Sequence, residues 1–188
     1  MSLKNLISRL CDSCPGGNDL TTPQALLDVL YAAIGVPGLD PCSNRWSTVD
    51  SAFRLTPPKE DGLKASWGSL CMSSLGSPRY VYCNPPWGRG ELIKWAEKAV
   101  LEASAGTKIA MLVPLDPTTA WCELLYHADP KLLLLKERQR YGGHKHVNPK
   151  SEQLLLLGPW SLHEVESLAR TGKFWVLGNM HNMHNGLQ

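Results

Sequence analysis

The sequence contains no long uninterrupted apolar run, and this absence excludes several classes of protein. No stretch approaches the roughly 18 apolar residues that a membrane-spanning helix needs, so we expect no membrane partner. Charged residues interrupt the first ten positions, so we expect no secretory signal peptide there. The six cysteines therefore indicate reduced thiols in a cytoplasmic protein.

A strong net charge is also absent, because the formal net charge is only +2 at pH 7. A value this small does not by itself indicate a nucleic-acid-binding protein. The charge is unevenly distributed, however, since residues 131–150 hold six Lys or Arg and one acid. That segment carries a net +5 and leaves −3 for the rest of the chain. We therefore expect one basic face on a nearly neutral body.

The length and composition are those of one ordinary globular domain. The 188 residues are 43% hydrophobic and 19% charged, which is enough for a real core but not for two large domains. We expect a single domain over residues 1–188. Within it, residues 1–19 form an N-terminal extension and residues 179–188 a frayed tail.

The central stretch of the chain is the point where an apolar run ends at Asn84-Pro85-Pro86-Trp87. Residues 80–83 have the pattern of a buried strand. The two prolines lack N–H groups and fix φ, so the strand must stop there. The corner then presents one amide and one aromatic ring at the carboxyl end of a strand. Asn-Pro is also a common turn signal, so a turn beside a core tryptophan is the structural alternative.

This corner suits a planar base that carries an exocyclic amino group. The side-chain oxygen of Asn84 and the carbonyl of Pro85 can each accept one amino hydrogen, and Trp87 offers a stacking surface. Accepting both hydrogens draws the amino nitrogen toward a tetrahedral, nucleophilic form without a strong base. The predicted chemistry is therefore attack by an amino nitrogen on an electrophile held beside the corner.

Local patterns elsewhere predict alternating helices and strands. Thr22 should cap a helix whose first residue is Pro23, and a short strand should end at Asp40. We expect further helices over residues 91–104, 116–126 and 161–170, strands over residues 108–114, 131–136, 152–158 and 173–178, and irregular segments over residues 49–59 and 70–78. These elements predict a mixed α/β sheet with helices on both faces, parallel in the middle and antiparallel toward the C-terminal end.

The loop between the strands predicted at 131–136 and 152–158 is basic and long for a compact domain, which is typical of functional loops. Basic side chains there and beside the corner fit contacts with phosphate. These residues are Arg89, Lys136, Arg138, Arg140, His144, Lys145, His146 and Lys150. A solvated, charged hairpin without a ligand is the alternative.

Two pairs of residues near the chain ends have the spacing of metal ligands. Cys11 and Cys14 have zinc-ligand spacing, and so do His181 and His184, so the four could form one site if the chain ends meet. The distance between the pairs is far outside the usual finger spacing. We therefore expect free thiols and no bound metal.

The ordered set of motifs resembles the small phage-type DNA N6-adenine methyltransferases, the phage Dam-like family. The matching motifs, in chain order, are Thr22-Pro23, Leu39-Asp40-Pro41, Asp61-Gly62-Leu63 with Trp67, Asn84 to Trp87, Val113-Pro114, and Lys136-Glu137-Arg138. Each motif is weak alone, but the set covers most of the chain, from about residue 20 to residue 158. The resemblance implies DNA as the partner, and phage or prophage DNA that is modified against restriction.

The resemblance further implies a minimal class I methyltransferase fold that uses S-adenosylmethionine. The catalytic residues would be Asn84, Pro85, Pro86 and Trp87, and the cofactor would contact Thr22, Pro23, Asp40, Pro41 and Asp61. The glycine-rich cofactor loop of larger methyltransferases is missing, and residues 44–47 stand in its place. The expected reaction is methyl transfer to N6 of an adenine that has flipped out of the duplex.

The corner and the basic hairpin also fit functions other than methylation of adenine in DNA. The same corner would serve cytosine N4, an RNA base or a protein amide, and the basic hairpin favours nucleic acid among these. A DNA-binding protein that has lost its cofactor is a further alternative, which the missing glycine-rich loop favours and the intact corner opposes. The sequence does not indicate an oligomeric state.

Overall fold

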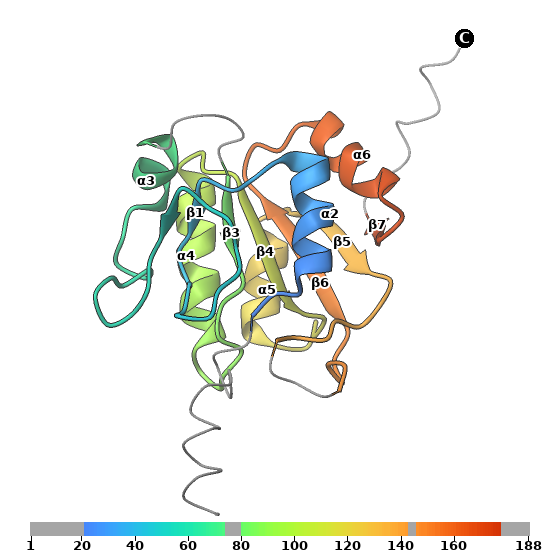
Figure 1. Ribbon diagram of the computed structural model, residues 1–188, viewed down its shortest axis with the longest axis horizontal. Coiled ribbons are helices and arrows are strands. Elements are labelled where there is room, and N and C mark those ends of the chain that lie inside the picture. The colour runs from blue at the N-terminus through green and yellow to red at the C-terminus, as the bar shows by residue number, and fades with distance from the viewer. Residues whose placement is uncertain (1–20, 74–79, 143–145, 178–188) are drawn as a thin grey trace, which may run out of the picture.

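The computed structural model describes residues 21–73, 80–142 and 146–177 (Figure 1). The predicted extension, residues 1–19, and the predicted tail, residues 179–188, lie outside this described part, as do the two pairs of Cys and His with zinc spacing. The described part contains five helices and seven strands. None of its helices is both long and apolar enough to cross a bilayer.

The strands form a single mixed sheet, as the sequence predicts. They are β1 (Leu39–Asp40), β2 (Phe53–Arg54), β3 (Val81–Cys83), β4 (Ile109–Pro114), β5 (Lys131–Leu135), β6 (Glu152–Leu157) and β7 (Phe174–Leu177). Their order across the sheet is β2-β1-β3-β4-β6-β5-β7. The first four in this order pair in parallel, whereas β6, β5 and β7 each pair antiparallel with their neighbours. The carboxyl ends of β1, β3 and β4 therefore meet at one edge of the sheet.

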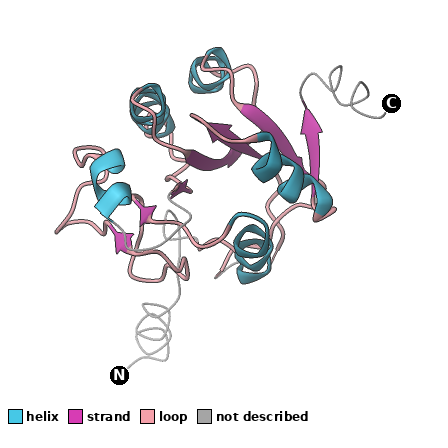
Figure 2. Cartoon of the chain, turned by 90° about the horizontal axis from the view of Figure 1, so that it is seen from above, coloured by secondary structure: helices cyan, strands magenta, loops and turns pink. Residues whose placement is uncertain are grey.

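Helices cover both faces of the sheet (Figure 2). They are α2 (Gln24–Ile34), α3 (Trp67–Ser73), α4 (Leu92–Ser104), α5 (Ala120–His127) and α6 (Leu162–Arg170). Helices α2 and α6 pack together on one face, and α4 and α5 pack together on the other. The short helix α3 lies beside α4, where the rings of Trp67 and Trp95 stack with centroids 6.2 Å apart.

The strand period of two divides the core between these two faces. Along β4, Ala110 and Leu112 face the α2 and α6 side, while Ile109, Met111 and Val113 face the α4 and α5 side. All five are buried, which explains why β4 reads as a continuous apolar run rather than an alternating one. Burial on both faces fixes the register of the central strands and with it the position of the loops at their ends.

Most of the predicted elements are confirmed, but the expectations for three segments between residues 49 and 126 are wrong. The segment 70–78 is not all loop, because α3 continues to Ser73. The segment 49–59 contains β2, which pairs with β1. The helix predicted over 116–126 begins only at Ala120, after a turn in which the Thr119 hydroxyl donates to the carbonyl of Asp116.

Candidate active site

The Asn-Pro-Pro-Trp corner lies where β3 ends, at the edge where the parallel strands finish. β3 stops at Cys83, and Asn84 is the first residue beyond it. Pro85 is buried, while Asn84 and Trp87 are half-buried. The chain then turns through Gly88 to Gly90 into α4. This is the strand-end position that the sequence predicts for the corner.

Asn84 is held in one orientation by a residue far away in sequence. Its Nδ2 donates to Thr22 Oγ1 at 3.0 Å, and Thr22 Oγ1 lies 2.9 Å from the hydroxyl of Tyr82. Burial raises the pKa of Tyr82 well above its usual value, so this hydroxyl stays protonated. Because Nδ2 is engaged, Oδ1 of Asn84 is the atom left to accept a hydrogen bond from a ligand.

This contact corrects the predicted role of Thr22. The residue before α2 is Pro23, and no side chain caps this helix. The prediction that Thr22 caps it, with Pro23 as the first helical residue, is therefore wrong. Thr22 is buried, and its hydroxyl is engaged by the buried Tyr82 on β3 and the half-buried Asn84 after it, instead of by the backbone of its own helix.

Trp87 is held from the other side by a tyrosine of the basic hairpin. The rings of Trp87 and Tyr141 meet edge to face, with centroids 5.4 Å apart and planes at 82°. The Tyr141 hydroxyl donates to Glu152 Oε2 at 3.0 Å, and Asn148 Nδ2 donates to Glu152 Oε1 at 2.6 Å. Trp87 Nε1 itself has no hydrogen-bond partner within the described part of the chain. The indole is thus fixed in place while its polar atom stays free.

Asp40 ends β1 and organises the loop that follows it. Its carboxylate accepts hydrogen bonds from the Cys42 N–H at 3.2 Å and from Ser47 Oγ at 3.1 Å. Burial raises the pKa of Asp40 to about 6, and these neutral donors offset only part of that effect. The structure thus gives Asp40 a role in shaping the loop from Pro41 onward, and its direct contact with a cofactor stays a prediction.

Asp61 approaches the same loop from another segment of the chain. Its carboxylate is exposed, accepts from the Leu63 N–H at 3.0 Å and pairs with Lys64 at 3.1 Å. The bond to Lys64 holds the pKa of Asp61 below its usual value. Gly62 packs so tightly on the carbonyl of Pro41 that a Cβ would collide with it. This close approach sets Asp61 beside the loop that follows β1.

A cavity of about 370 Å³ joins these parts. It is lined by Pro41, Cys42, Ser43, Asn44, Arg45, Thr56, Pro57, Asp61, Gly62, Asn84, Pro85, Pro86, Trp87, Trp95 and Tyr141. Six of the nine residues predicted for catalysis and cofactor binding therefore share one cavity. The other three, Thr22, Pro23 and Asp40, are absent from its lining, and two of them hold lining residues from behind.

The segment that contains these cavity residues also matches a known protein family. The chain matches the family described as DNA N-6-adenine-methyltransferase (Dam) over residues 15–161, which is well over half of its length. The chain belongs to this family. No curated protein matches it. Membership in the Dam family confirms the resemblance drawn from the motifs and assigns the chain to the methyltransferases that act on adenine N6 in DNA.

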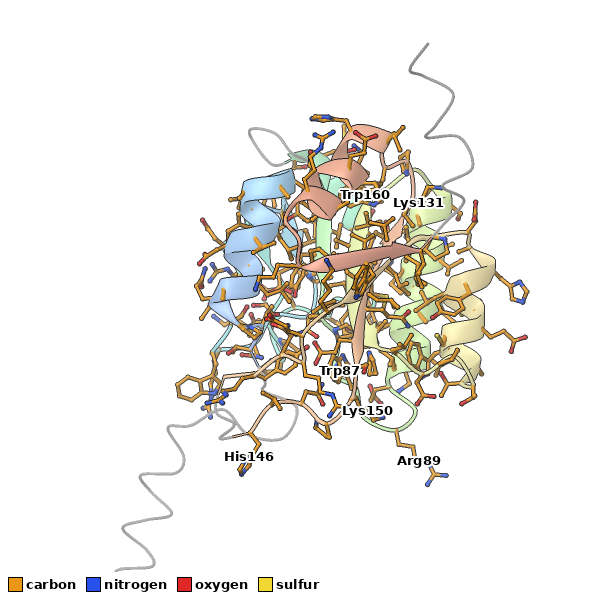
Figure 3. The ribbon with its side chains drawn as sticks, turned by 90° about the vertical axis from the view of Figure 1, so that its right-hand side faces the viewer. Trp87, Arg89, Lys131, His146, Lys150 and Trp160 are labelled. Atoms are coloured by element: carbon orange, nitrogen blue, oxygen red, sulfur yellow. The ribbon has the colours of Figure 1, made fainter. Side chains whose placement is uncertain are left out.

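Arg89, His146 and Lys150, which are expected to contact DNA, lie at the same end of the Dam-family fold as the corner (Figure 3). Trp87, Arg89, His146 and Lys150 lie at one end of the molecule and Lys131 at the other (Figure 3). Arg138, Arg140 and these three basic residues near Trp87 are exposed. Lys136 is engaged differently, because its Nζ lies 4.2 Å from the centroid of the Trp175 ring. His144 and Lys145 lie outside the described residues.

Sequence reasoning missed Tyr141, whose ring packs on Trp87, and Tyr82, whose hydroxyl lies 2.9 Å from the Thr22 Oγ1 that holds Asn84. Tyr141 stands directly before two glycines in an otherwise basic loop, which is the only local signal that it differs from its neighbours. The backbone N–H of Gly142 donates to the Thr21 carbonyl at 3.2 Å, so the hairpin is tied to the segment before α2. Among the described residues, no three His, Cys, Asp or Glu side chains form a group that could hold a metal ion.

Proposed function

We propose that this protein transfers a methyl group from S-adenosylmethionine to N6 of an adenine flipped out of duplex DNA. The observation that carries this proposal is the orientation of Asn84. With Nδ2 committed to Thr22, Oδ1 is the atom available to an amino hydrogen at the wall of the 370 Å³ cavity. Family membership supports DNA and adenine as the substrate.

The cavity beside Asn84 fits the proposed cofactor in size and in the chemistry of its walls. A volume of about 370 Å³ lies within the range of roughly 300–1,000 Å³ typical of small-molecule sites. Pro57 and Trp95 supply apolar surface, and the Asp61 carboxylate supplies acceptors for a ribose or an amine. S-adenosylmethionine would provide an electrophilic sulfonium methyl group. The loop held by Asp40 and the turn at Asp61 would bind the cofactor and orient it toward the corner.

The corner residues would bind and polarise the target base. Trp87 would stack against the adenine plane, in an orientation that Tyr141 already fixes. Asn84 Oδ1 and the Pro85 carbonyl would each accept one hydrogen of the amino group, which makes the nitrogen more nucleophilic without removing a proton first. The contribution of the protein is alignment and preorganised polarity rather than covalent catalysis.

The hairpin between β5 and β6 would hold the DNA backbone. Arg138, Arg140 and His146 are exposed and take part in no ion pair among the residues that the structure describes, so they can approach phosphates. Tyr141 connects this loop directly to Trp87. Binding of DNA to the hairpin and positioning of the base at the corner would therefore involve the same segment.

The test combines calorimetric titration with S-adenosylmethionine and transfer of a labelled methyl group to adenine-containing duplexes. The wild type should bind the cofactor and methylate DNA. Asn84→Ala should lower the turnover number about 1000-fold, because it removes a preorganised acceptor that acts on the reacting group. Wild-type turnover by Asn84→Ala would overturn the role of this residue. Failure of the wild type to bind the cofactor would favour a non-catalytic DNA-binding protein.

A further inference from the structure

A second cavity, of about 280 Å³, lies against Trp87 and shares no other lining residue with the first. It is formed where the turn before α4, the end of β4 and the start of α5 meet. The lining residues that carry its chemistry are Arg89, Leu92, Pro114, Asp116, Trp121 and Lys150. Neither the cofactor nor the target base proposed above requires this space.

The lining of this cavity contains two cationic side chains and one carboxylate, and all three can contact a ligand. Arg89 and Lys150 are exposed, and neither forms an ion pair in residues 21–73, 80–142 and 146–177. Both lie at the same end of the molecule as Trp87 (Figure 3). Asp116 accepts a hydrogen bond from Thr118 Oγ1 at 3.1 Å through Oδ1. Its Oδ2 accepts none within that part of the chain.

The walls of this cavity supply aromatic and apolar surface. Trp121 is half-buried beside the buried Pro114, and Leu92 closes the side toward α4. Two cations, a flat aromatic ring and a free carboxylate oxygen match the phosphate and the base of a nucleotide. The cations suit its phosphate, the ring suits its base plane, and the carboxylate suits an exocyclic amino group.

We propose that the second cavity binds the nucleotide next to the methylated adenine in the same DNA strand, an inference that rests on the proposed function. Arg89 and Lys150 contact its phosphate, Trp121 contacts its base, and Asp116 accepts a hydrogen from an amino group on that base. Thymine has no amino group. Asp116 therefore selects against thymine at one position beside the target.

The position of Trp87 explains why the occupant is a neighbouring nucleotide. Trp87 is the single residue common to both cavities. A base held at the corner and a second group held by Arg89 and Lys150 are thus separated by one indole ring. Successive nucleotides of one strand are covalently linked, so the strand that delivers the adenine to Asn84 must continue past Trp87.

The first test measures the preference at the flanking positions. A pool of duplexes with a fixed adenine between randomised positions is methylated and then sequenced with detection of N6-methyladenine. In the wild type, thymine should be depleted about fivefold or more at one neighbouring position. In Asp116→Asn the amide can also donate to thymine, so the depletion should fall below about twofold. Each ratio is taken within one protein, so a general loss of activity cancels. Equal depletion in both proteins would overturn the assignment.

The second test measures the phosphate contacts by fluorescence anisotropy of a short labelled duplex at several salt concentrations. Arg89→Ala and Lys150→Ala should each lower the slope of log K against log salt by about 0.9. Lys131→Ala is the matched control, because Lys131 is also an exposed lysine but lies at the opposite end of the molecule (Figure 3). Slopes for Lys150→Ala and Lys131→Ala that coincide would contradict the proposal.

The two tests separate failure of this inference from failure of the proposed function. If the wild type methylates the pool but Asp116→Asn keeps the same flanking preference, only the assignment of the second cavity fails. If the wild type methylates no duplex, the proposed function fails. In that case the flanking-nucleotide assignment falls with it, and the anisotropy measurement reports only whether the cavity contacts DNA.

Discussion

Two tryptophans at opposite ends of the same sheet are treated differently by their surroundings (Figure 3). Trp160 is buried, its Nε1 donates to the Leu157 carbonyl at 2.9 Å, and Lys108 Nζ lies 5.6 Å from its ring centroid. Trp87 is half-buried, and its Nε1 has no partner among the described residues. The first ring has every group satisfied, whereas the second keeps a polar atom free.

Two carboxylates repeat this contrast. Glu164 is paired with Lys108 at 2.8 Å and closes a capping box with Ser161. Burial opposes its ionisation, but Lys108 and Ser161 outweigh burial and hold the pKa of Glu164 below its usual value. Asp40 is buried with neutral donors only, and its pKa rises to about 6. Among the described residues, Trp46 Nε1 and Trp87 Nε1 are buried without a hydrogen-bond partner, in the loops that follow β1 and β3. Such departures from local optimality are typical of functional sites.

Substitution of the two tryptophans should separate the two ends of the sheet most strongly. Trp87→Ala should lower methyl transfer about 100-fold, because stacking on a base is worth roughly 1–3 kcal/mol. Trp160→Ala should instead lower the free energy of unfolding by about 3–5 kcal/mol, since it empties a buried site. Thermal unfolding and methylation rates check both, with Trp87→Phe as the variant that keeps a ring and most of the activity. If Trp160→Ala loses as much turnover as Trp87→Ala while folded, the two ends are not distinct.

The Asp40 carboxylate should make stability fall as the pH rises. Its folded-state pKa of about 6 lies above the ordinary value of 3.8, so the folded protein binds the proton more tightly than the unfolded chain. The stabilisation from the protonated form is complete below about 3.8 and is lost as the pH rises through about 6. Asp40→Asn has no such dependence, so at pH 8 it should be more stable than the wild type by roughly 2–3 kcal/mol.

Urea unfolding of both proteins at pH 4 and pH 8 measures this difference. The gap between them should be small at pH 4 and open at pH 8. Asp40→Asn should also bind S-adenosylmethionine more weakly, because the loop from Pro41 to Ser47 loses its charged acceptor. A constant gap at both pH values would show that Asp40 titrates normally in the folded protein.

The sequence predicted those elements whose signals are local. Buried runs gave the central strands, and Ser161 with Glu164 three residues later gave the capping box of α6. The Asn84 corner was predictable because Pro85 and Pro86 end a strand by their own covalent structure. In each case the information lies within a few residues of the element that it determines.

The errors arise where distant contacts override local signals. Thr22 has the position of a helix cap, but its hydroxyl is taken by Tyr82 and Asn84, sixty or more residues away. Residues 70–78 read as a loop, yet α3, which begins at Trp67, continues into them as far as Ser73. Glu102 on α4 accepts the N–H groups of Trp67 and Gly68 and so caps that helix from outside. No window of local sequence contains these pairs.

The contact between Thr22 and Asn84 gives a smaller effect, of positioning rather than direct contact. Thr22→Val keeps the shape but removes the acceptor for Asn84 Nδ2, so the amide can rotate and present its N–H groups to the substrate. We expect the turnover number to fall about tenfold while KM for S-adenosylmethionine changes little. Thr22→Ser restores the hydroxyl and should recover most of the rate. Equal turnover in the Val and Ser variants would exclude the positioning role.

We expect the smallest effect on function from a substitution at Glu164, which is paired with Lys108 and Ser161. Glu164→Gln removes the ion pair with Lys108 and weakens the capping box, so it should lower the free energy of unfolding by about 1 kcal/mol at pH 7. Because the pKa of Glu164 is held below its ordinary value of 4.5, this contribution is present above that value and is lost as the pH falls through the folded-state pKa. Methylation should be unchanged, since Glu164 lies outside the lining of both cavities. A matched loss of turnover would mean that the far end of the sheet also governs the site.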